Sequence, residues 1–165
     1  LGSVCTAFAA TGSATEAPAP EKHEAVKAEN GSKVNTSASG KATVTSIKKT
    51  NKKEVSISSK VVVDGVKYTV TRIEAKTFAN APKATKVTLP STITSLGAQA
   101  FTGAKSLKTI VIKSTKTVKV NKDAFKGVNT KKVTIKVTSM SKKELTAFKK
   151  QLKKAGFKGT VKLVK

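Results

Sequence analysis

The sequence contains very few of the residues that build catalytic or metal sites. Cys5 is the single cysteine and His23 the single histidine, so neither an internal disulfide framework nor a thiolate metal cluster can form. Only nine acidic residues are spread over the 165 positions. They compose no nucleophile–base pair or ligand cluster with a recognisable spacing. The sequence therefore predicts a protein that is not an enzyme and that carries no cofactor.

Aromatic residues and long apolar runs are also scarce. Phe, Trp and Tyr make up 4% of the chain and Trp is absent, which suits thin stacked layers better than a thick globular interior. A hydrophobic content of 38% in 165 residues allows about one domain with a modest core. No run of about 18 or more apolar residues is present, which argues against a membrane-spanning helix.

Negative charge is scarce, and the positive charge is almost all lysine. The formal net charge is +24, and Arg72 is the only arginine. Lysine is a hydrated point charge without the planar fork of arginine, so diffuse attraction to an anionic partner is favoured over precise recognition. Residues 1–40 hold three Lys against four Glu, so the excess charge belongs to the rest of the chain.

A repeated pattern fills the middle of the sequence: an aliphatic residue, a phenylalanine five residues later, and then an alternating strand. The three sets are Ile73/Phe78/Val87-Leu89, Leu96/Phe101/Ile110-Ile112 and Val120/Phe125/Val133-Ile135. Equivalent positions recur at spacings of 23 and 24, and the strand pairs at 23 and 23. A fixed period of this length predicts a solenoid, in which the three phenylalanines stack.

The N-terminal segment has two different compositions. Residues 1–10 are predicted to be the remnant of a signal peptide, with Ala7-Phe8-Ala9 as a small-residue cleavage site. A lipoprotein site at Cys5 would need a small residue in place of Val4, and an ordinary disordered N-terminus is a further alternative. Residues 11–41 are dominated by small, polar and charged residues and are predicted to be a disordered tether.

Caps are expected at both ends of the repeats at 70–138. Residues 42–69 form the predicted N-terminal β cap, because Asp64-Gly65 between two apolar runs predicts a hairpin. Residues 139–165 form the predicted C-terminal cap. There Ser141 and Glu144 have the spacing of a capping box, a helix is expected over 142–155 with Gly156 as its stop, and a final strand near 160–164.

The three phenylalanine-centred units, with Val87-Thr88-Leu89-Pro90 leading through residues 93–97 into Ala100-Phe101, resemble the BspA-type leucine-rich repeats of secreted and surface proteins. The Lys-rich segment 142–161 is similar to the terminal unit of bacterial members. The resemblance covers about residues 42–165. It implies a right-handed solenoid with a short parallel sheet on one face. The expected fold is thus a β-rich α/β leucine-rich-repeat solenoid of about three to four rungs, with an N-terminal β-hairpin cap and a C-terminal capping helix and final strand. The resemblance also implies a secreted, extracellular or cell-surface protein for adhesion or protein binding.

The candidate binding surface lies on the outward side of the predicted strands, because side chains alternate along a strand. The outward residues are Lys86-Thr88-Pro90, Thr109-Val111-Lys113 and Lys132-Thr134-Lys136. Strands lie about 4.8 Å apart, within the Debye length of about 8 Å, so the lysines are expected to act as one positive strip. We predict that an anionic partner contacts Lys86, Thr88, Val111, Lys113, Lys132, Thr134 and Lys136.

Other interpretations of the lysines stay open. They also fit side chains that only keep a solenoid soluble and block edge pairing, which would make the chain a passive structural protein of the cell envelope. The lysines of the predicted helix suit an anionic membrane, although its apolar face is about what is needed to seal the last rung. Lysines also give salt-dependent binding to nucleic acid. The favoured hypothesis is a non-catalytic module that binds wall polymer, acidic glycan or an acidic protein.

Overall fold

The computed structural model describes residues 17–165, and the signal-peptide remnant predicted over 1–10 lies outside them. Within the described residues the chain forms mostly short strands, with two 3-10 helices and one α-helix. In chain order these elements are β1 His23–Lys27, β2 Lys33–Thr36, β3 Lys41–Ser46, β4 Glu54–Ser56, β5 Lys60–Val63, β6 Val66–Ile73, η1 Thr77–Asn80, β7 Lys86–Leu89, β8 Ser95–Leu96, β9 Thr109–Ile112, β10 Lys119–Val120, η2 Thr130–Lys132, β11 Thr134–Val137, α1 Lys142–Lys154 and β12 Thr160–Leu163.

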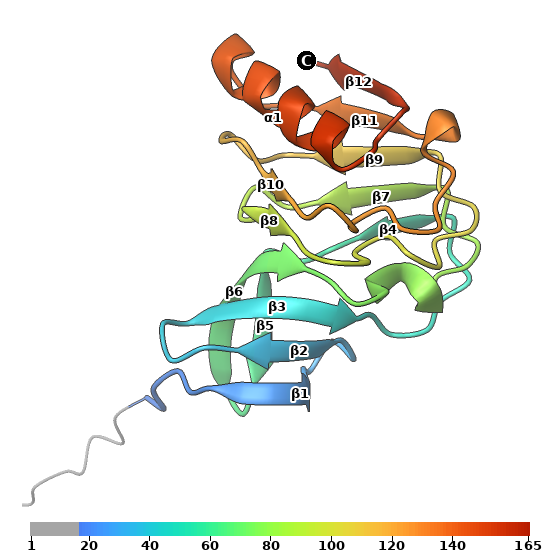
Figure 1. Ribbon diagram of the computed structural model, residues 1–165. Coiled ribbons are helices and arrows are strands. Elements are labelled where there is room, and N and C mark those ends of the chain that lie inside the picture. The colour runs from blue at the N-terminus through green and yellow to red at the C-terminus, as the bar shows by residue number, and fades with distance from the viewer. Residues whose placement is uncertain (1–16) are drawn as a thin grey trace, which may run out of the picture.

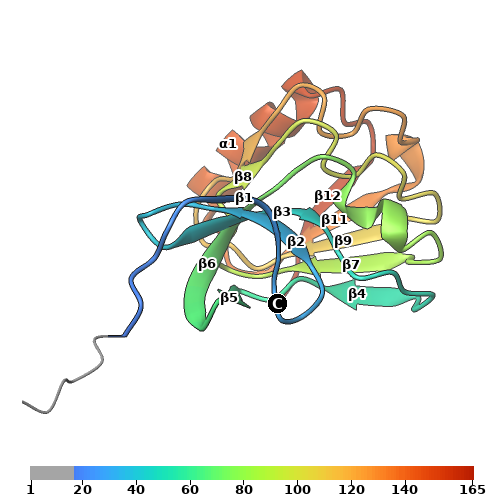
Figure 2. The ribbon, with the colours of Figure 1, turned by 90° about the horizontal axis from the view of Figure 1, so that it is seen from below.

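The chain winds as a coil that contributes strands alternately to two sheets (Figure 1). One sheet has five parallel strands in the order β12-β11-β9-β7-β4. The other has the order β1-β2-β3-β6-β8-β10, with β5 paired to β6. Viewed along the stack, the two sheets form two sides of the coil (Figure 2). Four strands of the parallel sheet come from successive turns of the coil and the fifth, β12, is the predicted final strand. Apart from its β5–β6 hairpin, the second sheet was not predicted.

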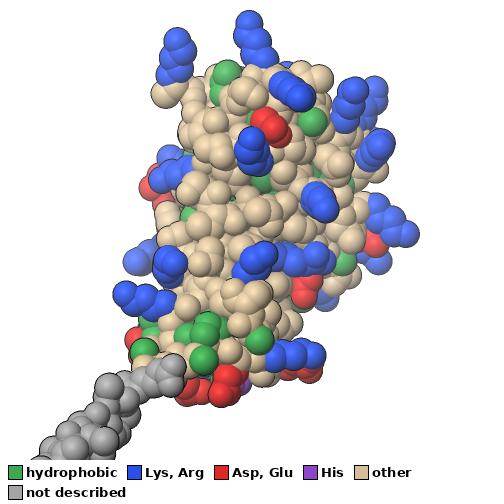
Figure 3. Space-filling view, turned by 90° about the vertical axis from the view of Figure 1, so that its left-hand side faces the viewer, with side chains coloured by type: hydrophobic (Ala, Val, Ile, Leu, Met, Phe, Trp, Pro, Cys, Tyr) green, Lys and Arg blue, Asp and Glu red, His purple; other side chains and the backbone are tan. Residues whose placement is uncertain are grey.

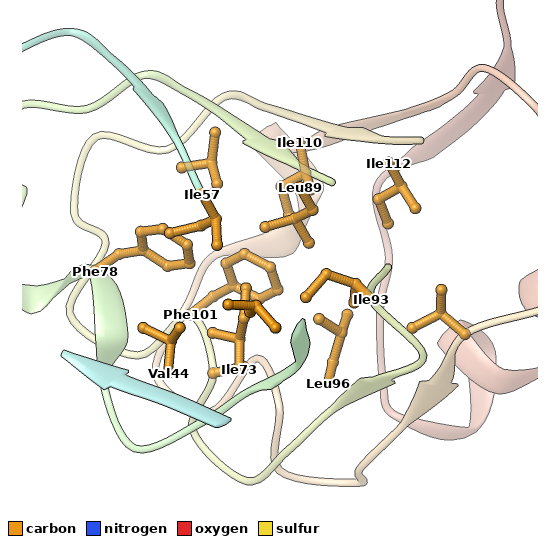
Figure 4. Close-up of a cluster of buried hydrophobic side chains, with 14 of the residues drawn as sticks. Val44, Ile57, Ile73, Phe78, Leu89, Ile93, Leu96, Phe101, Ile110 and Ile112 are labelled. Carbon is orange, nitrogen blue, oxygen red and sulfur yellow. The ribbon is translucent and has the colours of Figure 1, made fainter. Parts of the chain in front are cut away.

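A stack of phenylalanine rings runs through the core. The ring centroids of Phe78 and Phe101 are 5.4 Å apart with an interplanar angle of 8°, and those of Phe101 and Phe125 are 5.2 Å apart at 9°. This confirms the stack that the spacing predicted. Phe157 extends it, with its centroid 5.2 Å from that of Phe125 and its plane tilted by 48°. Aliphatic side chains from both sheets, such as Leu89 and Leu96, enclose the rings (Figure 4).

The strand of the third unit has a different register from the predicted one. Val133 and Ile135 are both buried, as predicted, but Ile135 is the partner of Ile110 and Val137 is the partner of Ile112. The predicted equivalence of Val133 with Ile110 is therefore wrong. A shift by two residues keeps every side chain on its face, so alternation alone could not reveal it. The additional residues form η2, which has no counterpart in the second unit.

The N-terminal segment forms strands, so the prediction of a disordered tether over 11–41 is wrong from residue 23 onward. Strands β1 and β2 pair antiparallel, and β2 pairs with β3. Val34 on β2 is fully buried, and the Glu21 N–H donates to the hydroxyl of Tyr68 at 2.8 Å. The few apolar residues here suffice because they do not form a core of their own but cover the open end of the coil.

The predicted N-terminal cap over 42–69 combines two structures. Strands β3 and β4 pair parallel with β6 and β7, so they form a first turn of the coil. Strands β5 and β6 form the hairpin predicted from Asp64-Gly65, and both turn residues have positive φ, 49° and 77°. The hairpin is therefore an insertion after the first turn.

Helix α1 follows the predicted bounds closely. The Oγ of Ser141 accepts a hydrogen bond from the Glu144 N–H at 3.2 Å, which is half of the predicted capping box. At the other end the Gly156 N–H donates to the carbonyl of Lys153 and the Phe157 N–H to that of Leu152, the pattern of a glycine C-cap. Strand β12 then pairs with β11, close to the predicted final strand.

The second half of the capping box is wrong, because the carboxylate of Glu144 turns to Thr117 in the preceding turn of the coil. Its Oε2 is 2.6 Å from the Thr117 Oγ and 2.7 Å from the Thr117 backbone nitrogen. These two hydrogen bonds, helped by the charges of Lys116 and Lys143, lower the pKa of Glu144 below its ordinary value of 4.5. The carboxylate therefore fastens the helix to the loop before β10.

A folded-state pKa below the unfolded one contributes stability above the unfolded pKa, and this contribution is lost as pH falls through the folded pKa. We expect Glu144→Gln to lower the melting temperature most at neutral pH, with the difference from wild type shrinking below about pH 4.5. Thermal melts from neutral to acidic pH measure this. Thr117→Val, which removes the hydroxyl donor, should show part of the same dependence. A difference that stays constant over the range would contradict the argument.

Candidate functional site: a lysine-rich sheet face and C-terminal unit

The outward side of the five-stranded sheet, called here the sheet face, is set by the strand register. Partner residues lie side by side on neighbouring strands, so the outward side chains form two rows across the sheet. The rows are Glu54, Lys86, Thr109, Thr134, Thr160 and Ser56, Thr88, Val111, Lys136, Lys162. The sheet face thus mixes lysines with threonines, and it carries a single acid at the β4 edge.

The structure places five of the seven predicted residues on the sheet face, namely Lys86, Thr88, Val111, Thr134 and Lys136. Lys113 lies just past β9, where its N–H donates to the carbonyl of Leu89 at 3.3 Å.

Lys132 does not belong to the sheet face, because it lies in η2 before β11. The same two-residue register shift moved it out of the predicted row. As a result the lysines do not form one straight strip. Lys86 stands beside Glu54 and Thr109, whereas Lys136 stands beside Val111 and Lys162.

Sequence reasoning missed Lys162 as a member of this surface. It is the register partner of Lys136 on β12 and is exposed. The signal was available, because extending the period-two alternation into the predicted final strand places Lys162 outward and Val161 inward. Two adjacent lysines at the spacing of neighbouring strands, about 4.8 Å, make the C-terminal side of the sheet face more positive than the β4 side.

The C-terminal unit, residues 142–165, is the most positive part of the chain. It holds nine lysines against one acid, Glu144. Helix α1 turns Phe148 and Leu152 into the core, where both are buried, so these two residues cannot serve as an apolar surface for a membrane. Its lysines remain exposed.

Most lysines of the described chain have no carboxylate partner. Within residues 17–165 there are two ion pairs, Lys22–Glu24 and Arg72–Glu74, and a contact between His23 and Glu21. All three lie in the N-terminal half, where the acids are concentrated. The space-filling view shows basic side chains over the whole height of the molecule, and more acidic side chains in its N-terminal part than in its C-terminal part (Figure 3). The positive charge is therefore not neutralised within the described part of the chain.

The chemistry available to this surface is electrostatic attraction and hydrogen bonding. Residues 17–165 contain no group of three or more His, Cys, Asp or Glu side chains that could hold a metal ion. The same described residues include no helix with the length and apolar character needed to cross a membrane. Ammonium groups and threonine hydroxyls can instead donate hydrogen bonds to the oxygens of an anionic partner.

A family model of the BspA type leucine-rich repeat region (6 copies) matches residues 71–165. This chain belongs to the BspA-type leucine-rich repeat family. The match runs from the end of β6 through β12. It confirms the resemblance noted from the phenylalanine-centred units. No curated protein matches the sequence.

Two solved structures share the fold of this BspA-type chain. A leucine-rich repeat protein from Bacteroides capillosus has a TM-score of 0.58 and 20% identity, over 90% of this chain and 100% of the other. A leucine-rich cell surface protein from Faecalibacterium prausnitzii has a TM-score of 0.53 and 23% identity, over 76% of this chain. The match spans only 34% of that cell surface protein. At these identities the likeness concerns the fold.

Proposed function

We propose that this BspA-type protein is a secreted or cell-surface binding module, without catalytic activity, that holds an anionic partner on its sheet face and C-terminal unit. The observation that carries the proposal is the set of lysines without carboxylate partners in residues 74–165, against three acids in the same range. A charge excess of this size disfavours the compact state through self-repulsion, and an anionic partner relieves it.

The arrangement favours a partner with repeated negative charges. Neighbouring strands are about 4.8 Å apart and the Debye length is about 8 Å at physiological salt, so the fields of lysines on adjacent strands overlap. A wall polymer, an acidic glycan or an acidic protein segment presents such a series of charges. The surface location is supported by one structural relative, which is described as a cell surface protein.

Two alternatives make different predictions. A passive structural protein would carry the lysines for solubility alone, and its binding would depend only on the number of charges. A binder of single-stranded nucleic acid would use aromatic side chains for base stacking, but Phe78, Phe101 and Phe125 are buried in the core. The lysine positions and the buried rings therefore favour an anionic polymer or protein.

A quadruple substitution tests whether position matters. We expect Lys86→Gln, Lys113→Gln, Lys136→Gln and Lys162→Gln together to weaken binding to purified anionic wall polymer at least tenfold, since a lysine near an anionic surface contributes about 1 kcal/mol. Binding is measured by retention on immobilised polymer over a salt series, with heparin-like glycan and DNA columns beside it.

The matched control removes four exposed lysines from the N-terminal part, Lys27, Lys33, Lys60 and Lys67. Both variants lose the same charge. Equal losses of retention would show that net charge alone matters, and would support the passive alternative. Stronger retention on DNA than on either polymer would support the nucleic-acid alternative.

A further inference from the structure

Strand β4 is an open edge of the five-stranded sheet. It lies at the end of the strand order and pairs only with β7. The backbone hydrogen bonds between this part of the chain and the β7 strand come from alternate residues. The carbonyl of Lys53 accepts from the Lys86 N–H at 3.1 Å, and the Ile57 N–H donates to the carbonyl of Thr88 at 2.9 Å.

The intervening residues of β4 present their backbone groups to the other side. In a parallel ladder successive residues direct their N–H and C=O groups to opposite edges, so those of Glu54 and Ser56 face away from β7. No strand of the described residues pairs with them there. This edge can therefore form hydrogen bonds with an added strand.

A groove runs along this free edge because the two sheets end at different levels. The other sheet continues past β3 with β2 and β1 (Figure 1), whereas the five-stranded sheet stops at β4. The groove has a volume of about 620 Å³, and its lining includes residues 54–58, Asn30 and Ser32. A smaller hollow of about 430 Å³ continues it past Lys48 and Lys49.

The lining of the groove combines apolar and positive groups. Its apolar part comes from buried or half-buried side chains, including Val44, Val55 and Val61. Lys48, Lys49 and Lys52 also line it and are exposed, against a single acid, Glu54. Alternate side chains of an extended peptide would therefore meet apolar surface, while carboxylates would meet the lysines.

We propose that the free edge of β4 binds an extended acidic peptide segment of a partner protein, which adds to the sheet as a further strand. Main-chain hydrogen bonds to Glu54 and Ser56 supply affinity, and the groove selects the side chains. A second copy of this chain is a poorer occupant, because its own free edge at β12 carries Lys162 and is followed by Lys165. Adding β12 to the groove would bring these lysines against Lys48 and Lys49.

Fluorescence anisotropy with a labelled seven-residue peptide of alternating valine and aspartate tests the proposal. The same peptide with N-methylated backbone amides keeps its charge and side chains but loses the donors of a strand. We expect the unmodified peptide to bind and N-methylation to weaken it at least tenfold, the effect of about two lost hydrogen bonds. Equal affinity of the two peptides, or no binding at about 1 mM peptide, would overturn strand addition.

Charge-reversal variants separate the groove from the net charge. Lys48→Glu, Lys49→Glu and Lys52→Glu together are expected to weaken the peptide far more than the matched set Lys105→Glu, Lys126→Glu and Lys131→Glu, which are also exposed. Equal losses would overturn the assignment of the groove.

A further measurement uses the wild-type protein alone, so it does not depend on the folding of any variant. Hydrogen exchange of the Glu54 and Ser56 amides should slow at least tenfold when the peptide is added. Unchanged exchange at these two amides with bound peptide would place the peptide elsewhere and overturn the proposal.

Discussion

Replacing Phe101 with alanine is expected to lower the free energy of unfolding by about 3–5 kcal/mol, the range for a large-to-small change at a buried aromatic residue. Phe101 is fully buried, with a stacked ring on each side, 5.4 Å from Phe78 and 5.2 Å from Phe125. Its removal leaves a cavity between two turns of the coil and separates their rings. Urea denaturation followed by circular dichroism measures the loss.

Phe157→Ala provides the control for this prediction. Phe157 ends the stack, contacts one ring instead of two, and is tilted by 48° against it. We expect it to cost less than Phe101→Ala. In a solenoid each turn contacts only its neighbours, so Phe101→Ala should also lower the denaturant m-value if it divides the molecule into two folding units. Equal destabilisation by both substitutions would show that a ring inside the stack contributes no more to stability than the ring at its end.

Gly159→Ala is expected to destabilise the protein by more than about 3 kcal/mol, beyond the usual cost of overpacking. A Cβ at this position would collide with the carbonyl oxygens of Val133 and Thr130, and would lie 2.7 Å from the ring of Phe157. The Val133 carbonyl accepts a hydrogen bond from the Thr160 N–H, and the Thr130 carbonyl accepts one from the Val133 N–H. Neither carbonyl can move aside without breaking the contacts that join β12 to β11. The C-terminal strand would therefore detach, and thermal melts would show the loss.

Gly127→Ala is the matched control, because a Cβ there meets no atom within 4 Å. Its only cost is the left-handed backbone, with φ of 76°, which a residue with a side chain adopts at about 1–2 kcal/mol. If Gly159→Ala cost no more than Gly127→Ala, the close approach of β12 to β11 would be refuted.

The phenylalanine spacing was the part of the sequence that specified most of the fold. Bulky rings that recur at a nearly constant spacing are buried together when successive turns of the coil stack, and Phe78, Phe101 and Phe125 stack in this way. The alternating strands were visible for a related reason, since each presents two aliphatic residues to the core. Strands of two residues, such as β8 and β10, leave no such pattern, so the continuation of the second sheet beyond the predicted hairpin could not be foreseen.

Register and termini were harder to predict, for two separate physical reasons. A shift of two residues in β11 exchanges Val133 for Val137 with no change of face, and it moved Lys132 away from the candidate surface. The segment containing Val34 has too few apolar residues to fold alone, and it is ordered only through contact with the coil. Which lysines face one partner therefore depends on pairings that local composition does not encode.

The acidic residues are placed unevenly, so negative and positive charge are separated along the chain. Among residues 17–165, six of the eight acids precede residue 75, whereas residues 142–165 hold nine lysines and one acid. Such a separation produces a dipole moment along the axis of the coil. The field of a negatively charged surface would exert a torque on this moment and turn α1 and β12 toward the surface, with β1 pointing away from it.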